Sequence, residues 1–113
     1  MDQNHTLLGN AREFLKEARQ AKINGSYNSA TTLFFKAIAV LVDLFILKKE
    51  GFIPSNHTER FKLLKEKYIE IYRIMDKDFP VYQDSYRLKI TKQTAEVIEK
   101  DVEEITKLTR IEC

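Results

Sequence analysis

The sequence has few of the residues that interrupt helices. Its 113 residues include three glycines, two prolines and no tryptophan. Glycine and proline mark most turns, so the long stretches between them favour a few long helices over many short strands. A chain of this length also fits one domain, residues 1–113, built around a single core. We therefore predict an all-α fold.

Cysteine is almost absent. The single cysteine, Cys113, leaves no partner for a disulfide within the chain, and it argues against a zinc cluster or a Cys–His catalytic pair. The first ten residues, MDQNHTLLGN, have no basic region followed by an apolar run, so we expect no signal peptide. These features predict a reducing, cytoplasmic location.

Long apolar runs are also scarce. The longest, Leu33 to Leu47, contains Lys36 and Asp43 and is short for crossing a bilayer. We expect a buried core helix here, with a membrane segment as the alternative. The net charge of +2 is that of an ordinary soluble protein, and it neither proposes nor excludes RNA as a partner.

Two helices are expected in the first half of the chain. Asn4 or Thr6 can cap the first, which should end near Gly25. Ser26 or Asn28 then opens a second helix that runs to about Glu50 and that Gly51 closes. This second helix is apolar on nearly every side, so it belongs at the centre of a bundle or at a face shared with a second subunit.

A third helix should follow the proline of GFIPSN. Asn56 stands three residues before Glu59, which is the spacing of a capping box, so the helix should begin at or next to His57. Its expected apolar stripe is Phe61, Leu64, Tyr68, Ile71, Ile74 and Met75. The segment 76–89 has no sustained period, and we predict a structured loop with at most one helical turn.

Thr91 can cap the last helix. Apolar residues then repeat at alternating steps of three and four at Ala95, Ile98, Val102, Ile105 and Leu108. Together these elements predict an antiparallel up-and-down four-helix bundle, with room for an extra short helix between the third and fourth.

His57 is the first candidate for chemistry. At a helix start it can serve as a general acid or base, or contact a phosphate, and the alternative is a helix-start residue that packs against the linker. Arg60 lies one turn later on the same face, so the two can hold one phosphate. His5, the only other histidine, lies near the end of the chain and is expected at the surface.

Tyr82, Tyr86 and Arg87 form a second candidate set. Two aromatic rings and a guanidinium can stack a base and pair with a phosphate, or they can fasten the loop to the bundle. Lys36 and Asp43 share one face of the second helix, where they can reach the bundle end or pair across a subunit interface. No glycine-rich phosphate loop, nucleophile elbow or histidine–carboxylate metal spacing occurs, so we expect no metal and no cofactor.

Three stretches together resemble the HEPN superfamily of small helical domains, named for higher eukaryote and prokaryote nucleotide binding. They are SYNSATTLFFKAIAVLVDLFILKKEG, GFIPSNHTERFKLL and YQDSYRLKITKQTAEVIEKDVEEI. The first is similar to the long central helix of the family, the second to its proline linker and histidine, and the third to its tyrosine–arginine pair and closing helix. The resemblance covers Arg12 to Leu108.

The resemblance implies a helical bundle that is usually dimeric, is often encoded with a small nucleotidyltransferase, and frequently acts as a metal-independent ribonuclease toxin. In nuclease members an arginine precedes the histidine by four to six residues. Here those positions hold Gly51, Phe52 and Ile53, and Arg60 follows His57 instead.

Two functions follow. The leading hypothesis is a dimeric interaction module that binds a partner protein such as a nucleotidyltransferase, a nucleotide or RNA, without catalysis and without a membrane. The alternative is a divergent metal-independent ribonuclease of a toxin–antitoxin system, in which Arg60 or Arg87 replaces the usual arginine.

Overall fold

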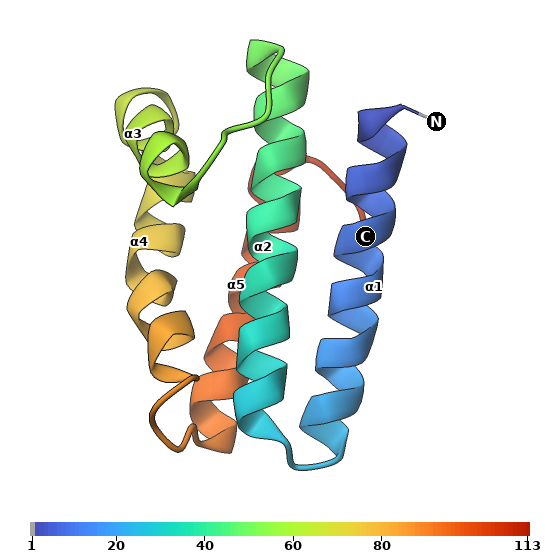
Figure 1. Cartoon of the computed structure of the whole chain (residues 1–113), viewed down its shortest axis with the longest axis vertical. Coiled ribbons are helices and arrows are strands. Elements are labelled where there is room, and N and C mark those ends of the chain that lie inside the picture. The colour runs from blue at the N-terminus through green and yellow to red at the C-terminus, as the bar shows by residue number, and fades with distance from the viewer. Residues whose placement is uncertain (1) are drawn as a thin grey trace.

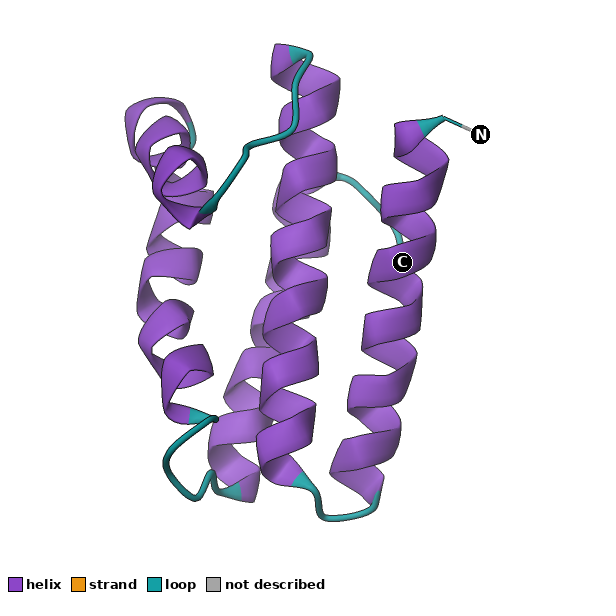
Figure 2. Cartoon of the chain, viewed as in Figure 1, coloured by secondary structure: helices purple, strands orange, loops and turns teal. Residues whose placement is uncertain are grey.

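The computed structural model describes residues 2–113, and these residues form five α-helices and no strand. The helices are α1 (Gln3–Ile23), α2 (Tyr27–Glu50), α3 (His57–Lys67), α4 (Ile69–Asp84) and α5 (Lys92–Thr109). The prediction of an all-α fold is confirmed. Short loops join the helices (Figure 2). In Figure 1, α2 stands between α1 and α4, and α5 lies behind it.

Helix α2 supplies most of the core. It packs against α1, α4 and α5, and side chains on all of its sides are buried, which explains a sequence that is apolar nearly all round. The largest fully buried ones are Phe34, Phe35, Ile38, Leu41, Val42, Leu44 and Ile46. The predicted central position of this helix, in contact with more than one neighbour, is confirmed.

By length and composition alone, α2 is also long and apolar enough to cross a membrane. Its most apolar window has a mean hydropathy of 2.1, and 61% of that window is buried inside the chain. A core helix of a soluble protein passes the same test, so the property is weak support for a membrane location.

The start of α1 differs from the prediction. Asp2 is the N-cap, and its carboxylate accepts a hydrogen bond of 2.7 Å from the backbone N–H of His5. The predicted caps, Asn4 and Thr6, lie inside the first turn, so that prediction was wrong. An aspartate at this position satisfies a free N–H group and also complements the positive end of the helix dipole.

The glycines end the first two helices as predicted. Gly25 and Gly51 have φ angles of 79° and 84°, in the left-handed region that glycine adopts without a steric penalty. Ser26 is the N-cap of α2, although its side chain makes no capping hydrogen bond. These residues set a short turn between α1 and α2, which lie side by side (Figure 1).

The predicted third helix is divided in two. Tyr68, with φ −136° and ψ 65°, ends α3 and precedes α4. Its hydroxyl donates a hydrogen bond of 2.6 Å to Glu50, and its ring lies edge-on to Phe45 at 4.9 Å between centroids. These two contacts with α2 therefore stabilise the break at Tyr68 more than one further turn of helix would. The prediction of one continuous helix through this position was wrong, whereas all six residues of the predicted apolar stripe are buried or pack against the core.

The prediction of a loop at residues 76–89 was also wrong for most of that segment. Helix α4 continues to Asp84 and includes Pro80, which lacks the N–H group that would bond to the preceding turn. A proline inside a helix costs about 3 kcal/mol. The helix persists because it has tertiary partners on both sides of the proline: Phe79 and Tyr82 both pack against Phe35 of α2.

The last helix follows the prediction closely. Thr91 is its N-cap and accepts a hydrogen bond of 3.2 Å from the N–H of Thr94. The predicted stripe is buried at Ala95, Ile98, Val102 and Ile105, and is partly buried at Leu108. A regular amphipathic pattern with a good cap was therefore sufficient to identify this helix.

Candidate functional site

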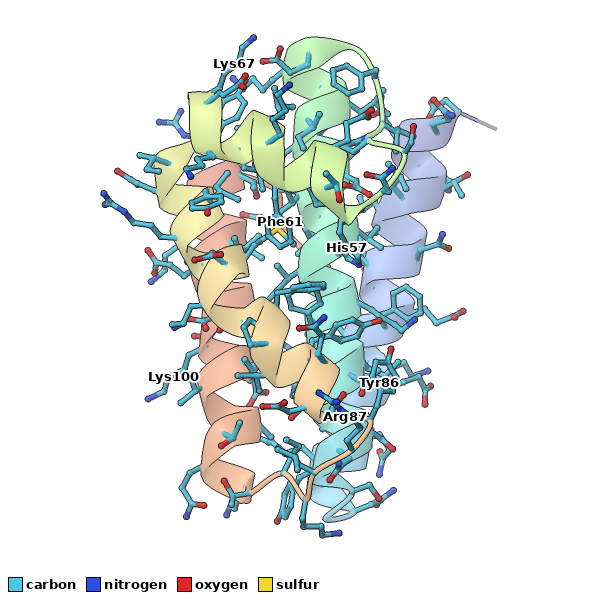
Figure 3. All side chains as sticks on the ribbon, turned by 60° about the vertical axis from the view of Figure 1, so that its left-hand side comes forward. His57, Phe61, Lys67, Tyr86, Arg87 and Lys100 are labelled. Carbon is cyan, nitrogen blue, oxygen red and sulfur yellow. The ribbon has the colours of Figure 1, made fainter. Side chains whose placement is uncertain are left out.

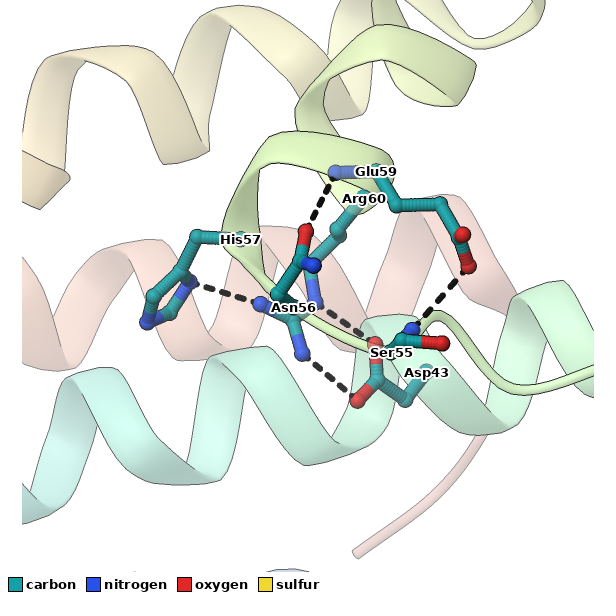
Figure 4. A network of polar contacts seen from close by, with 6 residues as sticks. All are labelled: Asp43, Ser55, Asn56, His57, Glu59 and Arg60. Carbon is teal, nitrogen blue, oxygen red and sulfur yellow. Dashed lines mark hydrogen bonds and ion pairs between the residues drawn. The ribbon is translucent and has the colours of Figure 1, made fainter.

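His57 is the first residue of α3. The side chain of Asn56 accepts a hydrogen bond of 2.9 Å from the N–H of Glu59, and the carboxylate of Glu59 accepts one of 3.0 Å from the N–H of Ser55 (Figure 4). This is a capping box in which the return bond reaches one residue further back than usual. The predicted start of the helix is confirmed.

Arg60 is held by an ion pair inside the protein. Its Nε and Nη2 atoms donate to the two carboxylate oxygens of Asp43 at 2.6 and 2.8 Å (Figure 4). Arg60 is 7% exposed and Asp43 is 9% exposed. From the sequence we expected Asp43 either to reach the bundle end or to pair across a subunit interface. The structure instead pairs it with Arg60 of the same chain.

Arg60 also fixes the protonation of His57. Its Nη1 lies 2.6 Å from Nδ1 of the imidazole. A guanidinium can only donate, so Nδ1 is the acceptor and the ring proton of the neutral imidazole sits on Nε2. Burial, and then the positive charge of Arg60, lower the pKa of His57 below its ordinary value, against the opposing pull of Asp43.

Aromatic rings surround the imidazole of His57. Its centroid lies 4.9 Å from Phe79, 6.2 Å from Phe61, 6.4 Å from Phe35 and 6.5 Å from Tyr82. These rings come from α2, α3 and α4, so the histidine sits where three helices meet. The surroundings are apolar and disfavour the imidazolium form.

Tyr82 extends this cluster toward the end of α4. Its ring stacks on Phe35 at 4.7 Å, and its hydroxyl accepts a hydrogen bond of 2.7 Å from the hydroxyl of Tyr86. Burial and that bond raise the pKa of Tyr82 to about 12. Tyr86 is 65% exposed. His57, Tyr82 and Tyr86 therefore form one continuous row from the interior to the surface.

Arg87 is not part of that row. It follows the end of α4 at the surface, well separated from His57 along the helix (Figure 3). Within residues 2–113 its guanidinium has no hydrogen-bond or ion-pair partner. His5 lies in the first turn of α1 and is exposed. The structure thus joins four of the five predicted ligand-binding residues and leaves Arg87 outside this group.

Asn28 fastens the loop that contains Tyr86 and Arg87. Its side-chain NH2 donates to the carbonyl oxygens of Ser85 and Leu88 at 3.0 and 2.6 Å, and its carbonyl oxygen accepts from the N–H of Ile90 at 3.1 Å. From the sequence, this fastening role was the alternative to ligand binding for Tyr82, Tyr86 and Arg87 together. Asn28 therefore fastens the loop together with the hydrogen bond from Tyr86 to Tyr82, and the side chains of Tyr86 and Arg87 are both exposed.

A shallow pocket of about 220 Å³ opens beside the cluster. Lys36 and His57 line it together with Asp43 and Arg60, and apolar side chains complete its wall: Phe14, Phe35, Ala39, Val40 and Tyr82. Lys36 is partly buried, and no acidic partner lies within ion-pair distance of it among the described residues. The pocket therefore combines an apolar wall with one amine that has no internal counter-ion.

The sequence analysis did not predict that Asp43 pairs with Arg60, nor that the rings of Phe35 and Phe79 surround His57. One signal was available: an aspartate in an otherwise apolar helix requires a cation, because unpaired burial costs several kcal/mol. Within residues 2–113, no group of three or more metal-ligating side chains comes together.

Comparisons with protein-family models, with curated proteins and with solved structures returned no match. The resemblance to the HEPN superfamily therefore stays a prediction based on the sequence.

Proposed function

We propose that this chain is an HEPN-like interaction module of the cytoplasm, which forms a homodimer and binds a partner protein, a nucleotide or RNA without cleaving it. In this proposal the four long helices are an antiparallel up-and-down bundle with α3 inserted between α2 and α4. A nucleotidyltransferase is the partner that the resemblance implies. The observation that carries the absence of catalysis is the state of Arg60, whose guanidinium is bound by Asp43 and His57.

The same contacts argue against His57 as a general base. Its free nitrogen, Nε2, already carries the ring proton, and Nδ1 is occupied by Arg60. Accepting a second proton would place an imidazolium beside a guanidinium in apolar surroundings. A metal-independent ribonuclease needs one group that takes a proton and a free cation near the phosphate. Neither His57 nor Arg60 is in that state.

The exposed end of the aromatic row suits binding. Tyr86 offers a ring face at the surface, and Arg87, the next residue, offers a guanidinium. An aromatic ring and an arginine side by side can stack a base and pair with a phosphate or a carboxylate. We assign the first contacts with a nucleotide, RNA or partner protein to these two residues, with Tyr82 behind them.

The first experiment measures RNA cleavage and RNA binding together. Purified protein and His57→Ala are incubated with labelled single-stranded and structured RNA without added metal, and binding is followed by fluorescence anisotropy. We expect no cleavage by either protein. Cleavage by the wild type that His57→Ala loses would overturn the proposal in favour of the divergent metal-independent ribonuclease.

Binding has a control on α4, because Arg73 is an exposed arginine that also follows a tyrosine, Tyr72. We expect the double variant Tyr86→Ala/Arg87→Ala to weaken RNA binding by about tenfold or more, because stacking and phosphate pairing contribute together. Arg73→Ala should leave binding unchanged, and Tyr72 is kept because its ring packs against Phe61. Equal losses in both variants would remove the assignment. The homodimer is tested separately by light scattering, where a monomer would contradict it.

A further inference from the structure

A second hollow lies on a different side of α1. Helices α1 and α5 both pack on α2 but have little direct packing with each other. Between them is a space of about 460 Å³, lined by Leu15 and Arg19 of α1, by Val102 and Lys107 of α5, and by the chain after α5. A neighbouring space of about 330 Å³ continues along α1 and shares Leu15, Arg19 and Cys113 with the first. We call the two together the α1–α5 groove.

Two features bound this groove. Glu99 of α5 pairs with Lys22 and Arg19 of α1 and so ties the two helices together at the edge of the groove. The C-terminal residues cross from α5 toward α1 (Figure 1). Phe14, adjacent to Leu15, lines the pocket beside His57 instead. The groove and the candidate site therefore lie on separate faces of the molecule.

The groove concentrates positive charge. Its lining includes five cationic side chains: Arg12, Lys16, Arg19, Lys107 and Arg110. Arg19 is paired with Glu99, and the other four have no carboxylate within ion-pair distance among residues 2–113. Only two carboxylate side chains, Glu103 and Glu112, line it. The chain as a whole carries a net charge of +2, so the excess is local. On α1, the residues at 12, 16 and 19 follow helical spacing and share one face.

The base of the groove is aliphatic. Leu15 and Val102 are buried at its bottom, and Ile23, at one end, is 76% exposed. Neither space has an aromatic residue among its lining residues. Nucleic acid that binds in a basic channel usually stacks its bases on aromatic rings, which this groove does not offer. A peptide with carboxylates and an aliphatic side chain complements both the rim and the base.

We infer that the α1–α5 groove docks a short acidic segment of a partner protein. Carboxylates of that segment pair with the arginines and lysines of the rim, and an aliphatic side chain covers Ile23 and the base of the groove. This inference goes beyond the proposed function, because it concerns a different face and does not depend on His57, Tyr86 or Arg87.

The test uses a short labelled peptide of alternating glutamate and leucine, with a peptide of alternating glutamine and leucine as its neutral control. Binding to the full chain is measured by fluorescence anisotropy at low and high salt. The variant Arg12→Glu/Lys16→Glu/Lys107→Glu reverses three rim charges. The matched control, Lys48→Glu/Lys62→Glu/Lys92→Glu, makes the same change in net charge at exposed positions outside the groove.

Cys113 gives a local readout, because it is the only thiol in the chain and it lines both parts of the groove. The rate at which a thiol reagent modifies it reports whether the groove is covered. We expect the acidic peptide to bind and to slow this reaction, and the rim variant to bind it about tenfold or more weakly. The control variant should bind within about threefold of the wild type, and high salt should weaken binding.

Three results would overturn the inference: no binding of the acidic peptide, equal loss of binding in both triple variants, or unchanged reactivity of Cys113 in the complex. Preferential binding of single-stranded RNA that only the rim variant loses would also overturn it, and would make the groove a nucleic-acid channel. Circular dichroism of both variants checks that they are folded. Because Tyr86 and Arg87 are intact in both variants, failure here is distinct from failure of the proposed function.

Discussion

Asp43 and Arg60 join the middle of α2 to the first turn of α3 by two hydrogen bonds, of 2.6 and 2.8 Å, between a buried carboxylate and a buried guanidinium. Two-point pairing of this kind is directional, so it fixes how α3 lies across α2. It also keeps Arg60 beside His57. The same interaction thus sets local structure and occupies the guanidinium of Arg60, which in turn donates to Nδ1 of His57.

Removing one partner of this pair should destabilise the protein strongly. We expect Asp43→Asn to lower the free energy of unfolding by roughly 3 to 5 kcal/mol, because it leaves the Arg60 charge buried without a counter-ion. Urea denaturation measures the loss. Asp76→Asn, at an exposed position of α4, is the control and should be nearly neutral.

Replacing both Asp43 and Arg60 by apolar residues should have a much smaller effect on stability. The double variant Asp43→Leu/Arg60→Met should recover most of the stability that Asp43→Asn loses, since apolar side chains of similar size avoid the desolvation cost of both charges. A double variant as unstable as Asp43→Asn would contradict this account of the pair.

The imidazole of His57 should be neutral near pH 7, with its proton on Nε2. Its pKa in the folded protein lies below the value of about 6.5 found in unfolded chains, so this residue stabilises the fold fully above that pH. The stabilisation is lost as the pH falls through the lowered pKa. Nitrogen NMR of the two histidines measures tautomer and titration, with exposed His5 as the reference signal. A proton on Nδ1 would refute the assignment.

Asp78 should make stability fall as the pH rises. It is 1% exposed, and burial followed by its contact with Asp101 raises its pKa to about 8, although Lys77 acts in the opposite direction. In the unfolded chain an aspartate loses its proton near pH 4. Between about pH 4 and pH 8 the folded state therefore holds one proton more than the unfolded state, and stability decreases over that window.

The variant Asp78→Asn tests this directly. The amide keeps the shape of the protonated acid but cannot ionise, so we expect a gain of roughly 1 to 3 kcal/mol near pH 8 and little change near pH 4. Urea denaturation across that range measures it, with Asp76→Asn again as the control. Parallel pH profiles for wild type and Asp78→Asn would show that Asp78 is ionised in the folded protein.

Asn28 should govern the order of the loop between α4 and α5. Asn28→Ala removes three hydrogen bonds to the backbone of that loop, and we expect a loss of roughly 1 to 3 kcal/mol. Hydrogen exchange should become faster at Leu88 and Ile90. The control is Asn10→Ala, at an exposed position of α1. Unchanged protection of Ile90 would mean that other contacts hold the loop.

The sequence alone determined the elements that depend on neighbouring residues. Gly25 and Gly51 end helices because they adopt left-handed backbone, and Asn56 and Thr91 begin helices because their side chains accept free N–H groups. The regular spacing of apolar residues then identified α5 and the central place of α2. Each of these signals acts within a few residues along the chain, so it can be read without the fold.

Only the tertiary structure decided the features that depend on residues far apart in the chain. Tyr68 interrupts a continuous helical pattern because Glu50 and Phe45 bind it from α2, and α4 passes through Pro80 because its rings pack on Phe35. The contacts and protonation of His57 also depend on residues far away in the chain. Its spacing from Arg60 could be read from the sequence, but the partner that makes this arginine structural, Asp43, lies on another helix and is brought there by packing.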